Sequence, residues 1–304
     1  MKPINTLIGS VAVAFALAGP AAASDGPLVS SDWLADHLND PSVHVFEVSV
    51  NPGVFTEGHI PGATNLVWHT DLVDPVRRDI ASREDLQNAL RSAGVDSGDT
   101  IVLYGDTNNW FAAWGAWVLD VYGVDAKLLD GGRKLWEAEG RPLATETAQS
   151  EPGNIKLSQA DERHRARLLD VVSASNTGSH DIIDIRSPDE YSGAIIAPPG
   201  LKETAIRAGH VTGAVNIPWG AAVQEDGRFK SAEELKALYG ERGVDGSKPI
   251  ITYCRIGERS SHTWFALAKI LGYDVINYDG SWTEYGNAVG VPVTNLAGTL
   301  WTGR

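Results

Sequence analysis

Cysteine is almost absent from this chain. Its 304 residues include a single one, Cys254, so no disulfide can form within the chain. A lone thiol is either reactive, joined to another chain, or a small apolar filler of the core. The residues around it must decide between these alternatives.

Basic residues are also scarce. The 25 Lys and Arg side chains face 39 Asp and Glu, which gives a formal net charge of −14. Such a charge argues against nucleic acid or an anionic membrane surface as a partner, and an anionic substrate would need local cations. The motifs HExxH, GxGxxG and GxxxxGK are missing, and the eight histidines lack ligand spacing. We therefore expect no metal and no other cofactor.

Only the start of the chain is strongly apolar. Lys2 precedes an apolar run from about Leu7 to Leu17, and small residues follow up to Ala23. This order is typical of a secretory signal peptide, and the run is too short to span a bilayer. We expect residues 1–23 to be removed and the mature protein to be exported, to the periplasm, as a monomer that is not attached to the membrane.

The rest of the chain contains an internal repeat. SREDLQNALRSAGVDSGDTIVLYG (82–105) matches SAEELKALYGERGVDGSKPIITYC (231–254) at an offset of 149 residues, and GHIPGATN (58–65) matches GHVTGAVN (209–216) at an offset of 151. This period far exceeds that of solenoids, so we predict a duplicated domain in which each copy buries its own core. The copies are placed at 24–140 and 167–304, with a polar linker at 141–166.

Each copy alternates β-rich and helical stretches. Strands are expected at 43–49, 100–105 and 127–131, and again at 181–187, 249–254 and 274–280; helices are expected at 82–94, 109–123, 231–243 and 259–272. The strand runs are continuously apolar, a pattern typical of a parallel sheet covered on both faces. The predicted fold is α/β, with two tandem domains that each hold a mainly parallel sheet flanked by helices.

The copies differ at the end of one strand. Gly105 in GDTNNW stands opposite Cys254 in CRIGER. In open parallel sheets ligands bind beyond the carboxyl ends of the strands, where loops lead into helices. Inward-turned loop amides, the helix dipole, Arg255 and Arg259 all favour a thiolate over a thiol at this point. Cys254 is therefore predicted to be a nucleophile and not a core filler.

These features resemble the rhodanese family. CRIGERS after an apolar strand, DGG and DGS after the next strand, the GHxxGAxN turns and the tandem layout are similar to the two-domain thiosulfate sulfurtransferases of bacteria. The resemblance covers essentially the whole mature chain. It implies a catalytically silent first domain and a Cys254 that takes sulfur from thiosulfate as a persulfide. Cyanide or a thiol then accepts that sulfur, in a ping-pong reaction.

The resemblance also suggests roles for neighbouring residues. The family's arginine at the D-x-R-S position helps to bind the anionic substrate, and this role falls on Arg186; the alternative is an ion pair with Asp184 or Glu190. Several vertebrate relatives carry a lysine two positions after the cysteine, where this chain has an isoleucine. We therefore expect Arg259 to be the main cation of the loop.

Other loop residues have predicted roles too. Arg255 is expected to point outward and pair with an acid, and Glu258 to pair with an arginine or to select the anion. Ser260 or Ser261 is expected to cap the helix. The amides expected to stabilise the thiolate and the persulfide are those of Ile256, Gly257, Glu258, Arg259 and Ser260.

Residues present in both copies are interpreted as structural. His59 and His210 occupy the same position of the GHxxGAxN turns.

Trp110, Trp114 and Trp117 share one helix face, which indicates a core or a domain interface.

Three alternatives remain open. Cysteine phosphatases and arsenate reductases place an arginine six positions after the cysteine, where this chain has Ser260. Mercaptopyruvate sulfurtransferases have a loop resembling CGSG, with fewer charges than CRIGER. A persulfide carrier that serves a partner protein would need the same thiol.

Overall fold

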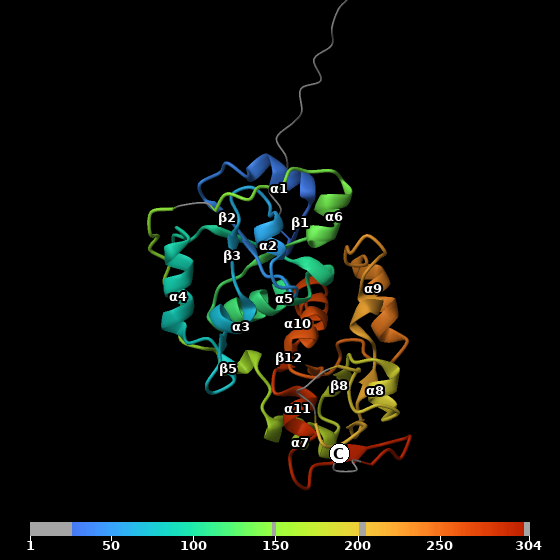
Figure 1. Ribbon diagram of the computed structural model, residues 1–304. Coiled ribbons are helices and arrows are strands. Elements are labelled where there is room, and N and C mark those ends of the chain that lie inside the picture. Colours follow the sequence, from blue (N-terminus) through green and yellow to red (C-terminus); the bar gives the residue numbers. More distant parts are fainter. Residues whose placement is uncertain (1–25, 148–149, 201–204, 301–304) are drawn as a thin grey trace, which may run out of the picture.

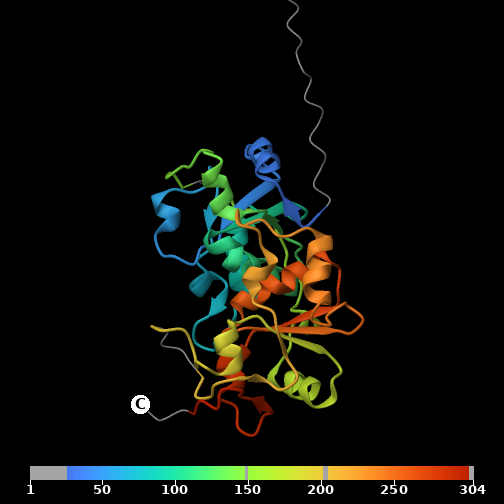
Figure 2. The same ribbon diagram turned by 90° about the vertical axis from the view of Figure 1, so that its right-hand side faces the viewer.

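The computed structural model describes residues 26–147, 150–200 and 205–300. The predicted signal peptide, residues 1–23, lies outside these ranges. Figures 1 and 2 show the first copy of the repeat, from blue to green, above the second copy, from yellow to red. Within the described ranges, no helix combines the length and the apolar character that a membrane crossing needs.

The first copy contains a five-stranded parallel sheet in the order β1-β7-β6-β2-β3. Its strands are β1 (Leu28–Val29), β2 (Val43–Glu47), β3 (Thr64–Asn65), β6 (Thr100–Tyr104) and β7 (Lys127–Leu129), and β4 (Val73–Asp74) and β5 (Asp79–Ile80) form a separate antiparallel hairpin. Its helices are α1 (Ser31–His37), α2 (Val54–Glu57), α3 (Trp68–Asp71), α4 (Arg83–Ser92), α5 (Asp106–Val121) and α6 (Gly132–Ala138).

The second copy contains a four-stranded parallel sheet in the order β10-β8-β11-β12. Its strands are β8 (Asp181–Asp184), β10 (Val215–Asn216), β11 (Ile250–Tyr253) and β12 (Val275–Tyr278), and β9 (His210–Val211) pairs antiparallel with β13 (Val293–Thr294). Its helical segments are α7 (Leu168–Thr177), α8 (Pro188–Ser192), η2 (Trp219–Ala222), α9 (Ala232–Gly240), α10 (Glu258–Trp264), η3 (Phe265–Ile270) and α11 (Ser281–Tyr285).

The predicted α/β fold with parallel sheets is confirmed, and equivalent residues of the repeat begin equivalent helices. Ser82 and Ser231 cap α4 and α9, where each hydroxyl accepts the N–H group three residues later. Such caps satisfy amides that the first helical turn leaves unpaired. The helix predicted at 259–272 begins at Glu258, and its second half, η3, has π-helical hydrogen bonding.

Each copy buries an apolar cluster of its own, as expected, but the two copies also share a cluster on the other face of each sheet. Helix α5 of the first copy packs against α10 of the second copy (Figure 1). One apolar cluster continues across them and includes Leu103 of the first sheet and Ile183 of the second. The opposite sheet faces have separate clusters, one in each copy. Because α5 is apolar on nearly its whole circumference, it needs cover on two sides, and the second copy supplies it.

Part of the predicted linker follows the surface of the first copy. Ile155 and Leu157 are buried in the shared cluster, and the N–H of Ile155 donates to the carbonyl of Val95. A short 3₁₀ turn, η1 (Glu162–His164), then leads to the second copy. The domain boundaries at 24–140, 141–166 and 167–304 stay a prediction.

Candidate active site

Cys254 lies at the carboxyl end of β11, where the chain turns into α10. Alternation along the strand places its side chain in the apolar cluster that both copies share, while Tyr253 faces the other cluster. The residue is fully buried. The N–H of Gly257 donates a hydrogen bond to Sγ over 3.1 Å. Gly257 is left-handed, with φ +101°, and this conformation turns the loop back toward the sulfur.

The surroundings of Cys254 favour the thiolate. Burial raises the pKa of the thiol. The Arg259 guanidinium and the amides of Ser260, Ile256 and Gly257 lower it, and together they outweigh burial, so the pKa lies below its ordinary value. Three of the five predicted loop amides thus act on the sulfur. For the amides of Glu258 and Arg259 the predicted role stays a prediction.

Ser281 fixes the backbone of the cysteine from the neighbouring strand end. Its Oγ accepts the N–H of Cys254 over 3.0 Å, donates to the carbonyl of Tyr278 over 2.7 Å and lies 3.9 Å from Sγ. Ser281 has φ +50°, while the equivalent residue of the first copy, in DGG, is Gly132 with φ +56°. A serine in this conformation is strained, and such strain persists where surrounding contacts enforce it. The DGS motif, which contains Ser281, contributed to the family resemblance, but no role was predicted for Ser281 from the sequence.

Arg259 links the loop to two other elements. Its Nη2 lies 3.6 Å from Oε1 of the buried Glu190 on α8, and its guanidinium lies 5.5 Å from the ring centroid of Trp110 on α5. Trp110 belongs to GDTNNW, the loop of the first copy that corresponds to CRIGER. The first copy therefore contributes a side chain that contacts the loop cation Arg259, which the sequence did not predict. Glu190 balances part of the charge of Arg259.

Glu258 and Arg255 flank the loop, and their predicted roles stay predictions. Glu258 is only 3% exposed, and its Oε2 has no hydrogen-bond partner among the described residues. Arg255 is half-buried, and its carbonyl accepts the N–H of Thr283. The prediction that Ser260 or Ser261 caps the helix is wrong, since Gly257 holds the N-cap position and both hydroxyls donate to its carbonyl.

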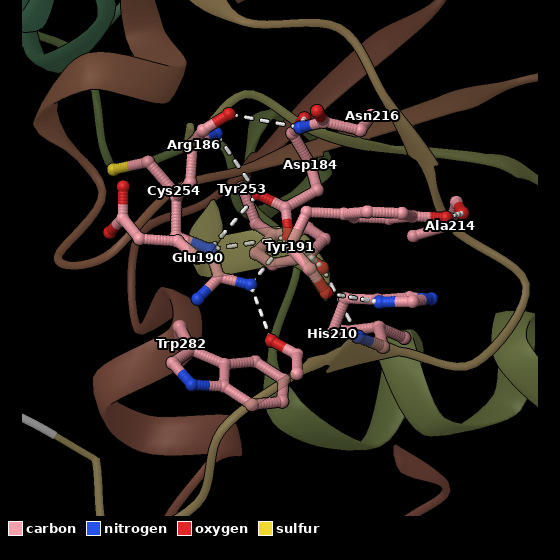
Figure 3. Close-up of polar contacts among 12 residues, drawn as sticks. Asp184, Arg186, Glu190, Tyr191, His210, Ala214, Asn216, Tyr253, Cys254 and Trp282 are labelled. Atoms are coloured by element: carbon pink, nitrogen blue, oxygen red, sulfur yellow. Dashed lines mark hydrogen bonds and ion pairs between the residues drawn. The ribbon is translucent and has the colours of Figure 1, made fainter. Parts of the chain in front are cut away.

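Arg186, the predicted substrate-binding cation, lies in the interior. It is 1% exposed, and it donates through Nε and Nη2 to the carboxylate of Asp184 and through Nη2 to the carbonyl of Gly209. Its guanidinium lies 4.7 Å from the Trp282 ring centroid (Figure 3). Of its terminal nitrogens only Nη1 lacks a partner among the described residues. These contacts favour the ion pair with Asp184, the alternative named above; the substrate-binding role stays a prediction.

The first copy contains the same type of network, which supports this interpretation. Tyr253 donates to Asp184, and Tyr104, its equivalent in the repeat, donates to Glu47. Each carboxylate also binds an arginine, and in the first copy this is Arg133 of α6. A network present in the copy without a cysteine stabilises the fold independently of any reaction. A sequence search for arginine next to Glu47 misses it, because Arg133 comes from another element.

The two repeated histidines are structural, as predicted. Nδ1 of His59 lies 2.9 Å from the carbonyl of Phe55, and Nδ1 of His210 lies 2.6 Å from that of Tyr191. Each imidazole also stacks on the ring of the same partner, and Figure 3 shows the second pair.

Comparisons with known proteins agree with this geometry. A relative from Saccharopolyspora erythraea, named "Putative thiosulfate sulfurtransferase", is 50% identical over 271 residues, which cover 88% of this chain and 96% of the relative. A relative from Thermus thermophilus, named "Sulfur carrier protein TtuD", is 48% identical over 88% of this chain and 95% of its own length.

Solved structures show the same fold. The crystal structure of SseA from Escherichia coli, described as a 3-mercaptopyruvate sulfotransferase, has a TM-score of 0.73 and 28% identity, and the match covers 84% of this chain and 99% of that chain. An anaerobic ergothioneine biosynthesis enzyme from Chlorobium limicola matches with a TM-score of 0.76 and 22% identity, over 88% of this chain and 70% of that chain. The family model of the rhodanese-like domain matches residues 30–139 and 168–288. This chain therefore belongs to the rhodanese family and contains two rhodanese-like domains in tandem.

Proposed function

We propose that the protein is a thiosulfate sulfurtransferase in which Cys254 carries the sulfur as a persulfide. The observation that carries the proposal is the loop after β11, where amides and Arg259 hold the only thiol of the chain with a lowered pKa. The first copy has Gly105 at this position and is proposed to be catalytically silent. The name of the relative from Saccharopolyspora erythraea supports the choice of thiosulfate.

The proposed reaction has two steps. The Cys254 thiolate attacks the outer sulfur of thiosulfate; the new S–S bond forms while the bond to the sulfonate sulfur breaks, and sulfite leaves with that electron pair. An acceptor, cyanide or a thiol, then takes the outer sulfur and returns Cys254 to the thiolate. The hydrogen bond from Gly257 and the charge of Arg259 stabilise the anion before and after each step.

Access to the sulfur requires movement. The Cys254 side chain is fully buried, so a donor reaches it only when side chains around the loop shift. Such gating is common in enzymes that exclude water from a reactive anion. Arg259, which is held by one carboxylate at 3.6 Å and one ring, is the cation best placed to follow an incoming dianion.

Mass spectrometry of the intact protein tests the proposal. After incubation with thiosulfate we expect a gain of one sulfur atom, which cyanide removes and which Cys254→Ala does not acquire. Turnover with mercaptopyruvate in place of thiosulfate should be slower; a clear preference for mercaptopyruvate would contradict the assignment of the donor. The same spectrum of protein purified from cells tests the proposed export, because removal of residues 1–23 changes the mass.

Replacing Arg259 by alanine should weaken catalysis mainly at low pH. Among the groups that lower the pKa of Cys254, the guanidinium has the largest effect, so its loss should raise that pKa. The thiolate exists above its pKa, and the acidic limb of the kcat/KM profile should therefore move to higher pH. A loss of about 10- to 100-fold at neutral pH corresponds to one charged interaction. Arg259→Lys should restore part of the shift; an unchanged acidic limb in Arg259→Ala would contradict the role.

A sulfur carrier is the second candidate, because the relative from Thermus thermophilus is named as one. A carrier and an enzyme need the same persulfide but differ in turnover. Rapid multiple turnover with cyanide or small thiols is expected for the enzyme. A persulfide that forms readily but passes only to a protein acceptor would favour the carrier.

A further inference from the structure

Glu258 is a buried titratable group for which the proposed reaction has no use so far. It directly follows Gly257, whose amide contacts the sulfur, and it is only 3% exposed. Its Oε2 has no hydrogen-bond partner among the described residues. A buried polar atom without a hydrogen bond destabilises the fold, so its presence beside the thiol requires an explanation.

The side chain borders a small hollow of about 40 Å³, which is large enough for a water molecule. Besides Glu258, its walls include Ile256, Arg78, Asp79, Asp279 and Gly280. The last four of these also line a groove of about 520 Å³ between the two copies. The hollow and the groove are therefore adjacent, and a proton can be exchanged between Glu258 and solvent along this route.

The charged groups around Glu258 favour its neutral form. Burial and the neighbouring Cys254 raise its pKa well above the ordinary value, while Arg78 of the β4–β5 hairpin and Arg255 oppose this shift. The two other acids of the hollow, Asp79 and Asp279, are both bound by Arg165 over 2.6 Å. The same surroundings therefore favour a protonated Glu258 and an ionised Cys254.

Building on the proposed function, we propose that Glu258 is the acid that protonates the outer sulfur of the Cys254 persulfide before the acceptor attacks it. That sulfur is negatively charged after thiosulfate has reacted, and its charge repels cyanide or a thiolate. Transfer of the carboxyl proton makes the outer sulfur neutral and leaves Glu258 as a carboxylate.

The remaining steps close the cycle. The acceptor forms a bond to the protonated outer sulfur, the Sγ–S bond breaks, and its electron pair stays on Sγ as the thiolate. The acceptor atom is formally oxidised and Sγ is reduced. The product, R–S–SH or HSCN, loses its proton to solvent, and Glu258 regains one through the hollow. No other oxidant or reductant is needed.

Glu258→Gln distinguishes a Glu258 that donates a proton from one that only fills space as a neutral side chain. Glutamine has the size and neutrality of the protonated glutamic acid but cannot transfer its proton. We expect Glu258→Gln to form the persulfide from thiosulfate at close to the parent rate, because that step needs no proton. Discharge of the isolated persulfide by cyanide, followed in a single turnover, should be slower by about 10²-fold or more.

The pH dependence of discharge should also distinguish the parent from Glu258→Gln, when each rate is divided by the concentration of the cyanide anion at that pH. The parent rate should fall as pH rises through the raised pKa of Glu258, whereas Glu258→Gln should lack this limb. Glu284→Gln is the matched control: this acid lines the neighbouring groove and accepts from Tyr278, and its variant should discharge like the parent.

Each outcome is decisive. Parental discharge in Glu258→Gln, with the parental pH profile, overturns the proposal. If Glu258→Gln does not fold, the parent profile alone decides, since a discharge rate that is flat on the alkaline side also overturns it. If the parent never acquires sulfur on Cys254, the proposed function fails instead, and this is seen before any discharge is measured.

Discussion

Replacing Gly257 by alanine should abolish most sulfur transfer without unfolding the chain. At φ +101°, an added Cβ would lie 2.5 Å from the carbonyl oxygen and 2.6 Å from Cα of Asp279. These are backbone atoms that cannot withdraw as a flexible side chain can, so the loop must move. The N–H of Gly257 then leaves the sulfur. Loss of one such donor lowers turnover by roughly 10²- to 10³-fold.

Gly243→Ala is the matched control for this substitution. Gly243 also has a positive φ, +81°, but an added Cβ there meets no atom within 4 Å. Its variant should pay only the backbone strain and keep the parental activity per folded molecule. The pH dependence of alkylation by iodoacetamide gives a second measurement: the thiol pKa should rise in Gly257→Ala and stay unchanged in Gly243→Ala. Equal activities of the two variants would show that the loop geometry is unimportant.

Local pattern predicted most of the fold. Continuous apolar runs gave the parallel strands, Ser82 and Ser231 marked two helix starts, and the offset of 149 residues placed Cys254 opposite Gly105. These features depend on neighbouring residues and on the comparison of two copies. The shared core was not predictable in the same way, because periodicity shows that α5 is apolar but not which element covers its second face.

Contacts between distant segments explain what the sequence did not show at the site. The motif around Arg186 reveals neither its burial nor its partners Gly209 and Trp282. Trp110 and Glu190 reach Arg259 from elements far away in the sequence. Cys254 itself was recognisable because everything that identifies it, the strand, the loop and the charges, lies within a few residues.

The Asp184–Arg186 pair leads to the largest expected effect on stability. Asp184 is fully buried and receives hydrogen bonds from Arg186 and Tyr253. In Asp184→Asn the guanidinium of Arg186 keeps its charge but loses its counterion in the interior. Breaking a buried pair in this way costs about 3–5 kcal/mol in the free energy of unfolding. Urea denaturation should show this decrease.

Asp226→Asn provides the control for this second substitution. Asp226 and Arg228 have the same spacing in the sequence and a comparable ion pair, but they lie at the surface, where solvent screens the interaction. This variant should denature like the parent. If the Asp184–Arg186 pair is structural, folded Asp184→Asn should keep the parental KM for thiosulfate at low temperature, since the network does not bind the donor. A large increase in KM with unchanged stability would instead return Arg186 to the role of a substrate-binding residue, and the equivalent Glu47–Tyr104–Arg133 network of the first copy would then need another explanation.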